Sequence, residues 1–216
     1  MAWFLTGAAA TMAPAQGRPA GVTWTTVIEN DTLSVTRVHM PPGTGGIISP
    51  RPAPMLVVQV SAGQAQITQP GHDSRGPRVA GDVTYVGPDE GHEVENIGAA
   101  PFDQLHVAIK ATRAPAPAAP ATEAPPGITR TPLLDNEAMR VVRVRFAPGA
   151  REPVHTHPND LLTIQISPGT VEILNGTNKS TSRGDAGGVR FLGRNVAHAF
   201  ASADAQPFEI LSIAIK

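Results

Sequence analysis

Cysteine is absent from the 216-residue chain. Disulfide bonds, thiolate zinc sites, iron–sulfur clusters and cysteine nucleophiles are therefore all excluded. A metal ion in this protein would have to be bound through nitrogen and oxygen atoms.

Charge is scarce and balanced. Seventeen Lys and Arg residues stand against eighteen Asp and Glu residues, and the formal net charge is −1. There is no basic block to attract a phosphate backbone, so nucleic acid is not an expected partner. No apolar run is long enough to cross a bilayer, so no membrane span is expected.

Turn-forming residues are abundant, with 21 glycines and 22 prolines. Such frequent breaks suit many short strands better than long helices, which disfavours an all-α fold. With 41% hydrophobic residues, the chain has enough apolar material for one mid-sized or two small domains.

Residues 1–20 allow two interpretations. The stretch is mildly apolar and ends in small residues around Ala13-Pro14-Ala15, as a secretion signal does. No Lys or Arg precedes Arg18, although a signal normally opens with positive charge. The alternative is a disordered, alanine-rich start. The first interpretation predicts a secreted or periplasmic protein, and the second a cytoplasmic one.

The chain matches itself at one constant shift of 106 positions. Residues that coincide at this shift include Arg37 and Arg143, Gly63 and Gly169, His92 and His198, and the closing residues 108–110 and 214–216. A constant offset over most of the chain indicates a duplicated domain. We expect one copy at 21–110, a second at 127–216, and an extended Pro/Ala linker at 111–126.

Both copies are expected to be all-β. Short apolar or β-branched runs bounded by Gly, Pro or Asn recur along each copy. They include Leu33–Met40, Met55–Val60, Arg140–Phe146, Leu162–Ile166 and Ile210–Ile215. Two barrels or sandwiches packed together would result, and their strand edges leave a homo-oligomer open. Alternation along the strands predicts that Arg37 and Arg143 lie on exposed faces.

Three histidines in the second copy are candidate metal ligands. His155 and His157 project to the same side of a strand, because side chains two residues apart share a face. His198 stands on a later strand that could cross nearby. Three imidazoles would suit a divalent Fe, Mn, Ni, Cu or Zn ion and leave coordination positions open.

The residues around these histidines resemble the two motifs of the cupin superfamily. The first motif corresponds to Gly149, five residues, His155-Thr-His157 and a closing Gly169, and the second to Gly184 through His198. The resemblance implies tandem jelly-roll (double-stranded β-helix) barrels, with His198 as the third histidine ligand. Leu161 stands where the family has a glutamate, so the carboxylate ligand is missing.

The first copy resembles the family in its second motif alone, at Val86–Asn96. Ser49 and Arg51 stand where the second copy has His155 and His157. One remaining imidazole, His92, rarely holds a metal, so we expect this degenerate copy to be metal-free.

Several residues are expected beside the histidines. Leu161, Thr163 and Gln165 share one strand parity, and together with Phe200 they are candidate pocket residues. Gln165 would act in the pocket or pair with the backbone. Asp160 and Glu152 are close in sequence and are candidates to replace the missing glutamate. Parity places Glu152 on the face opposite His155, so a bulge would be needed for it to reach the site.

Two function classes remain open. One is a metal-dependent oxygenase or related enzyme acting on a small molecule, which the resemblance implies. The other is a non-catalytic protein that binds a small ligand or has a structural role. No residue outside the histidine set stands out as a catalytic acid, base or nucleophile.

Overall fold

The computed structural model describes residues 21–110, the N-terminal half, and 124–216, the C-terminal half. All regular elements in these residues are strands, which confirms the expected all-β fold. No helix in them is long and apolar enough to cross a membrane. The expectations for residues 1–20 and 111–123 lie outside the described residues.

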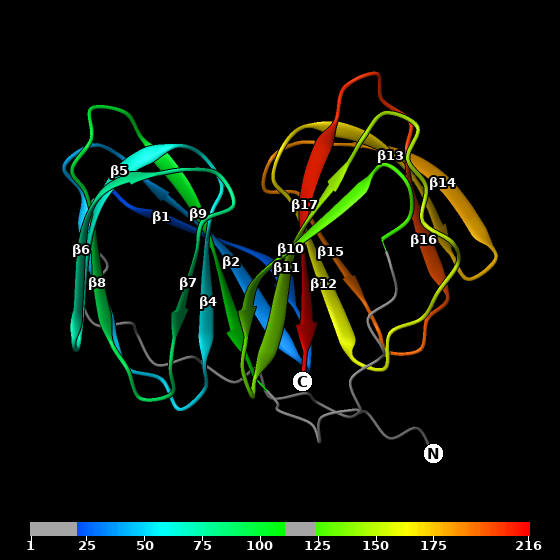
Figure 1. The fold of residues 1–216 in the computed structure, drawn as a ribbon. Coiled ribbons are helices and arrows are strands. Elements are labelled where there is room, and N and C mark those ends of the chain that lie inside the picture. Colours follow the sequence, from blue (N-terminus) through cyan, green and yellow to red (C-terminus); the bar gives the residue numbers. More distant parts are fainter. Residues whose placement is uncertain (1–20, 111–123) are drawn as a thin grey trace, which may run out of the picture.

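The N-terminal half forms two antiparallel sheets (Figure 1). One has the order β1-β2-β9-β4-β7, and the other the order β3-β8-β5-β6. The strands are β1 (Thr23–Glu29), β2 (Leu33–Met40), β3 (Gly45–Ile48), β4 (Met55–Gln59), β5 (Gly63–Gln69), β6 (His72–Arg78), β7 (Val83–Val86), β8 (His92–Asn96) and β9 (Phe102–Ile109).

The C-terminal half repeats this arrangement. One sheet has the order β10-β11-β17-β12-β15, and the other the order β14-β13-β16. The strands are β10 (Ile128–Asp135), β11 (Met139–Phe146), β12 (Asp160–Gln165), β13 (Gly169–Asn175), β14 (Asn178–Gly184), β15 (Val189–Leu192), β16 (His198–Ser202) and β17 (Phe208–Ile215).

Strand bounds in the two halves follow the shift of 106 positions closely. Six strands of the N-terminal half coincide end to end with their counterparts, and β1 and β4 differ from theirs by one residue at the start. The strand β3 has no counterpart. The corresponding residues 151–154 contain Pro153, which cannot donate a ladder hydrogen bond. This segment makes only isolated bridges, Arg151 with Ala201 and His155 with His198.

In each half the two sheets face each other and enclose an apolar core, as in a jelly-roll sandwich. In the C-terminal sandwich Phe146 and Phe208 of one sheet meet Val171 and Phe200 of the other. The rings of Phe146 and Phe208 stack with their centroids 4.9 Å apart. This interior is the frame for the candidate site.

The two five-stranded sheets also pack against each other through their outer faces (Figure 1). Fully buried residues from both halves form one core cluster, among them Leu56, Val58, Leu105, Val107, Leu162, Ile164, Leu211 and Ile213. The hydrophobic face that each sheet turns away from its own sandwich is thus covered by the other half.

The prediction that Arg37 and Arg143 lie on exposed faces is wrong. Both side chains are about one-third exposed, with values of 33% and 30%. Arg37 Nη2 donates to the carbonyl of Gly187 in the C-terminal half at 2.8 Å, and Arg143 Nη2 donates to that of Ala80 in the N-terminal half at 3.3 Å. The alternation of side chains correctly placed both arginines on the face that points away from their own sandwich. That face contacts the other half of the protein instead of water.

The two arginine contacts are nearly symmetric. Gly81 and Gly187, which occupy equivalent positions, have positive φ angles of 85° and 79°. A Cβ atom at either glycine would collide with the arginine of the opposite half. Such exchange of equivalent contacts is what a two-fold interface produces.

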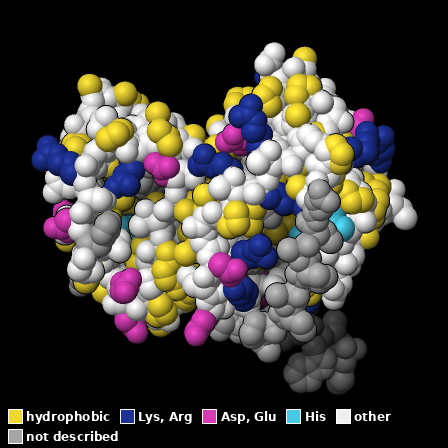
Figure 2. Space-filling view, viewed as in Figure 1, with side chains coloured by type: hydrophobic (Ala, Val, Ile, Leu, Met, Phe, Trp, Pro, Cys, Tyr) yellow, Lys and Arg dark blue, Asp and Glu magenta, His cyan; other side chains and the backbone are white. Residues whose placement is uncertain are grey.

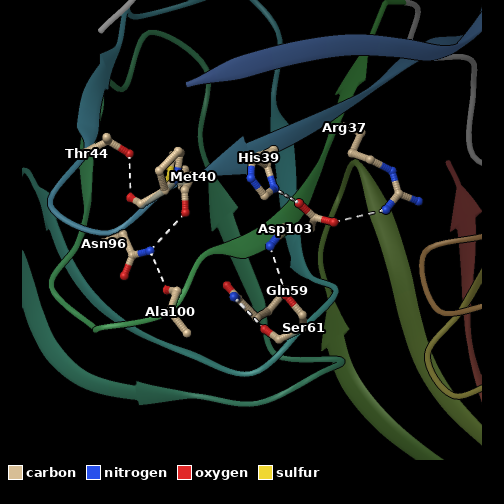
Figure 3. A network of polar contacts seen from close by, with 10 residues as sticks. Arg37, His39, Met40, Thr44, Gln59, Ser61, Asn96, Ala100 and Asp103 are labelled. Carbon is tan, nitrogen blue, oxygen red and sulfur yellow. Dashed lines mark hydrogen bonds and ion pairs between the residues drawn. The ribbon is translucent and has the colours of Figure 1, made fainter. Parts of the chain in front are cut away.

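A polar network supports each arginine. Asp103 accepts from Arg37 Nη1 at 3.4 Å, lies 2.7 Å from His39 Nδ1, and donates its own N–H to Ser61 Oγ at 2.9 Å (Figure 3). In the C-terminal half the equivalent residues are Arg143, Glu209, Arg145 and Ser167, and the same backbone contact to Ser167 Oγ measures 2.9 Å.

Candidate metal centre

His155, His157 and His198 come together at one end of the C-terminal sandwich. His198 begins β16, and His155 lies in the irregular segment before β12. The backbones of His155 and His198 exchange two hydrogen bonds of 3.0 and 2.9 Å. The backbone carbonyl of His157 accepts from Asn195 at 2.7 Å. Backbone pairing, and not a regular strand, therefore brings the three side chains together.

The three imidazoles are close enough to share one ion. One ring nitrogen from each lies within 4.8 Å of those of the other two, and they form the only such group of three ligating residues found in the described part of the chain. The Nε2 atoms of His155 and His157 are 3.1 Å apart. Two imidazole nitrogens about 2.1 Å from one ion, at a right angle, would be about 3.0 Å apart. The observed spacing fits ligands of a common ion.

Hydrogen bonds orient two of the rings. The Nδ1 atom of His155 lies 2.9 Å from the carbonyl of Pro153, and that of His198 lies 3.0 Å from the carbonyl of Val196. A carbonyl oxygen can only accept, so each Nδ1 carries the proton. The Nε2 atoms of His155 and His198 then keep free lone pairs, as metal ligation requires.

Burial favours the neutral imidazoles. Desolvation lowers the pKa of His157 to about 4, and the charges of His155, His198 and Arg130 add to this effect. Desolvation also lowers the pKa of His198, opposed by its hydrogen bond to Val196 and by the charge of Glu152. Neutral imidazoles are the form that binds metal.

The nearby carboxylates have other partners. Glu152 is buried and accepts from Arg130 Nη2 at 3.0 Å. Asp160 is buried and accepts from Thr32 Oγ1 at 3.2 Å and from the backbone of Arg194 at 2.9 Å. The parity argument for Glu152 does not apply, because its segment is not a regular strand. The charge of Glu152 acts on His198 without joining the ligand group.

Three of the four predicted pocket residues line a cavity of about 330 Å³ in the C-terminal sandwich. They are Thr163, Gln165 and Phe200, whereas Leu161 packs in the apolar core. The cavity wall does not include the three histidines. Phe200 connects the two regions, because it lines the cavity and its ring centroid lies 5.7 Å from that of His198.

The glutamines at equivalent positions make the same backbone contact. Gln165 Nε2 donates to the carbonyl of Ser167 at 2.8 Å, and Gln59 Nε2 donates to that of Ser61 at 2.8 Å. Of the two roles expected for Gln165, pairing with the backbone is therefore present. It coexists with a place in the cavity wall.

The interior of the N-terminal sandwich holds a different set of polar residues. His92 is buried, as is His106, which spacing alone did not single out. The His106 ring lies 6.3 Å from that of His92 and 5.3 Å from that of Trp24, and its Nε2 lies 3.3 Å from Gln104 Oε1. Burial lowers the pKa of His92 to about 4 and that of His106 to about 3.

A signal for His106 was present in the sequence. Gln104 and His106 share one parity on β9, which turns both side chains to the same face of the sheet. Spacing rules for metal ligands ignore polar pairs of this kind, and by spacing His106 lies outside any ligand set.

Histidine reaches the surface of the C-terminal half. The cyan side chain on that half in Figure 2 belongs to this group, because the C-terminal half contains no other histidine. His155 and His157 are partly exposed, whereas His198 is buried. The candidate centre is thus accessible from one side.

No protein-family model and no curated protein matches this sequence. Solved structures do match. A cupin 2 conserved barrel domain protein from Leptotrichia buccalis has a TM-score of 0.62 and 15% identity, over 94% of this chain and 92% of that chain. This chain has the cupin fold.

Two enzymes share the fold over most of their length. Salicylate 1,2-dioxygenase from Pseudaminobacter salicylatoxidans has a TM-score of 0.71 and 10% identity, over 89% of this chain and 76% of that chain. Oxalate decarboxylase from Lactobacillus farciminis, solved as a formate complex, has a TM-score of 0.70 and 12% identity, over 90% and 81%. At these identities the likeness concerns the cupin fold alone.

Proposed function

We propose that this chain is a two-domain cupin metalloprotein that binds one divalent transition metal through His155, His157 and His198. The observation that carries the proposal is the geometry of the three imidazoles. Two Nε2 atoms lie 3.1 Å apart, and the Nδ1 protons of His155 and His198 point to backbone carbonyls. With its Nδ1 protonated, His155 offers the Nε2 lone pair to an ion or to an N–H at the Nε2 of His157.

Iron, manganese, nickel, copper or zinc would suit the site. Imidazole nitrogen is a good ligand for iron, nickel, copper and zinc, whereas manganese more often takes oxygen ligands. No carboxylate belongs to the ligand group, so three neutral ligands would leave the charge of the ion uncompensated. When bound, the ion would supply Lewis-acid chemistry or dioxygen activation with open coordination positions. Glu152 would add a negative charge beside His198.

A metal-dependent enzyme acting on a small molecule is the function we favour. Two solved proteins with this fold are a dioxygenase of salicylate and a decarboxylase of oxalate, both small organic acids. The partial exposure of His155 and His157 would let such a molecule approach the ion.

The domain boundaries belong to the same proposal. Residues 21–110 would be a degenerate cupin domain without a metal, residues 127–216 the metal-binding domain, and residues 111–126 the linker between two copies of a duplicated domain. Support comes from the strand bounds, which recur 106 positions apart. A homo-oligomer and export from the cytoplasm stay predictions.

Elemental analysis of protein purified without a histidine tag tests the metal site. We expect about one equivalent of metal in the wild type and none in His155→Ala/His157→Ala. The matched control is His92→Ala, which removes the equivalent of His198 from the other half and should leave the metal content unchanged. Absence of metal from the wild type, even after reconstitution, would refute the proposal.

A second candidate function is non-catalytic binding of a small ligand. The specific observation in its favour is that the cavity wall contains Phe200 but none of the three histidines. Ligand binding by a wild type that holds no metal would support this function over catalysis.

A further inference from the structure

An arginine inside the C-terminal sandwich has no carboxylate partner among the described residues. Arg190 lies on β15, opposite Thr163 in the register with β12. Along β15, Val189 and Phe191 pack on the cluster between the halves, whereas Leu192 belongs to the core of the sandwich. Alternation therefore turns Arg190 inward with Leu192, and its side chain lines the cavity.

The surroundings of Arg190 make its charge costly. Burial lowers the pKa of this guanidinium, and no neighbouring charge contributes to the shift. A partly desolvated cation is normally compensated by an anion. Within the described residues no ion pair provides one, so the anion would have to come from outside the protein.

The barrel itself does not require this arginine. Thr84 occupies the equivalent position in the N-terminal half, where β7 pairs with β4 in the same way. The hydrogen bond between Thr163 Oγ1 and residue 190 uses the backbone carbonyl, not the guanidinium. A purely structural role for the Arg190 side chain is thus not supported by its contacts.

The rest of the cavity combines positive charge with an apolar wall. Arg37 and Arg183 also line it, and Asp185 is the one carboxylate in its wall. Apolar side chains complete the wall, namely Val171, Val189, Ala186, Phe200, Phe208 and Ile210. A volume of about 330 Å³ lies at the lower end of the range for small-molecule sites.

We propose that this cavity binds a small organic carboxylate whose charged group pairs with Arg190 and whose apolar part lies against Phe200 and Phe208. Guanidinium matches the two oxygens of a carboxylate geometrically, and such pairs are stronger than neutral hydrogen bonds. Phe200 also lies beside His198, with ring centroids 5.7 Å apart, so the cavity adjoins the proposed metal centre across this one ring. The claim that this ligand is the substrate rests on the proposed metal function, whereas the claim that it binds does not.

Calorimetric titration with benzoate, using neutral benzamide as a control of the same shape, tests the inference. We expect the wild type and His155→Ala/His157→Ala to bind benzoate with similar affinity, and benzamide at least about tenfold more weakly. Arg190→Gln should weaken benzoate binding at least about tenfold, and Arg190→Lys should weaken it less because it keeps the charge. The matched control is Arg140→Gln, an arginine of the same half outside the cavity, which should bind as the wild type does.

Each contrary result has a definite meaning. Equal affinity for benzoate and benzamide, or unchanged binding by folded Arg190→Gln, would overturn the inference. Loss of benzoate binding in the double histidine variant alone would place the ligand on the metal, which overturns the inference and supports the metal site. Binding that depends on Arg190 in a wild type without metal would support the carboxylate site and refute the metal function.

Discussion

The two halves of this protein agree where they face each other and differ inside. At the shared interface Arg37 and Arg143 reach across to the opposite half in nearly the same way. At one end of the sandwiches, by contrast, the exposed Ser49 and Arg51 stand where the C-terminal half has the partly exposed His155 and His157. The comparison teaches that two halves with one fold can carry different side chains at the corresponding end of each sandwich.

The physical reason lies in what each surface must contact. A two-fold interface pairs each position with the partner's equivalent, so a change in one half affects contacts of both. The apolar core of each sandwich is made of residues of its own half, although Arg37 of the N-terminal half reaches the cavity of the C-terminal sandwich. A substitution in one of these cores therefore changes chiefly that half.

The segment before β12 shows the difference most clearly. In the N-terminal half, residues 45–48 form the strand β3, paired with β8. In the C-terminal half the same stretch contains Pro153 and makes isolated bridges alone. This irregular backbone places His155 across from His198 and allows Glu152 to be buried near it.

The largest expected effect is loss of metal from one half only. His157→Ala should abolish metal binding, because removing one of three ligands leaves two imidazoles and open solvent. His92→Ala should leave metal binding unchanged. Mass spectrometry under native conditions measures both, and equal losses in the two variants would end the distinction between the halves.

The next largest effect is expected at the interface between the halves, where equivalent substitutions should destabilise the protein by similar amounts. Leu56 and Leu162 occupy equivalent positions, and both are fully buried in the cluster that joins the halves. Each substitution by alanine should lower the free energy of unfolding by about 2–5 kcal/mol, through lost transfer energy and a cavity. Urea denaturation measures the losses, and values that differ several-fold would show that the interface is not equivalent from its two sides.

Acid should destabilise the N-terminal sandwich. The pKa of His106 is lowered to about 3 and that of His92 to about 4, so both stay neutral in the folded chain while the unfolded chain binds protons below about pH 6.5. These histidines do not change the free energy of unfolding above that pH. As the pH falls from about 6.5 to about 4, they lower the free energy of unfolding by up to about 1.4 kcal/mol per pH unit for each histidine.

Thermal unfolding across this pH range, together with an NMR titration of the His106 ring, checks the expectation. His106→Gln should flatten the pH dependence even if it lowers stability at pH 7.5. A His106 ring that titrates near pH 6.5 in the folded protein would contradict it.

The smallest effect concerns the two arginine contacts. Arg37→Gln and Arg143→Gln each remove one hydrogen bond to a carbonyl of the other half and should cost about 1 kcal/mol. Because the two contacts are separate, the double variant should lose about the sum of both. A large deviation from additivity in urea denaturation would show that the contacts are coupled through the interface.

Much of the fold was predictable from the sequence. Alternating apolar runs and turn residues indicated the strands, and the constant shift of 106 positions anticipated equivalent bounds such as those of β2 and β11. The three histidines and three of the four cavity residues were also named from spacing and parity. These features follow from local periodicity, which the linear sequence contains.

Other features depended on what covers each face. Periodicity assigned Arg37 and Arg143 to a common side of their strands, but it could not show that the other half covers that side. It also offered no reason to select Arg190, which lines a cavity formed by several strands and has no ion pair among the described residues. His106 became notable only through its burial beside His92.

The sequence by itself determined the strands, the repeat and the three histidines at residues 155, 157 and 198 as candidate ligands. The tertiary structure alone decided that backbone pairing joins His155 to His198, that the outer sheet faces are buried, and that Arg190 lines a cavity. The reason is physical. The face of a strand to which a side chain points is set by neighbours along the chain. Which side chains lose contact with water, and which of them come together in one site, is set by residues that are far apart in sequence and meet only after folding.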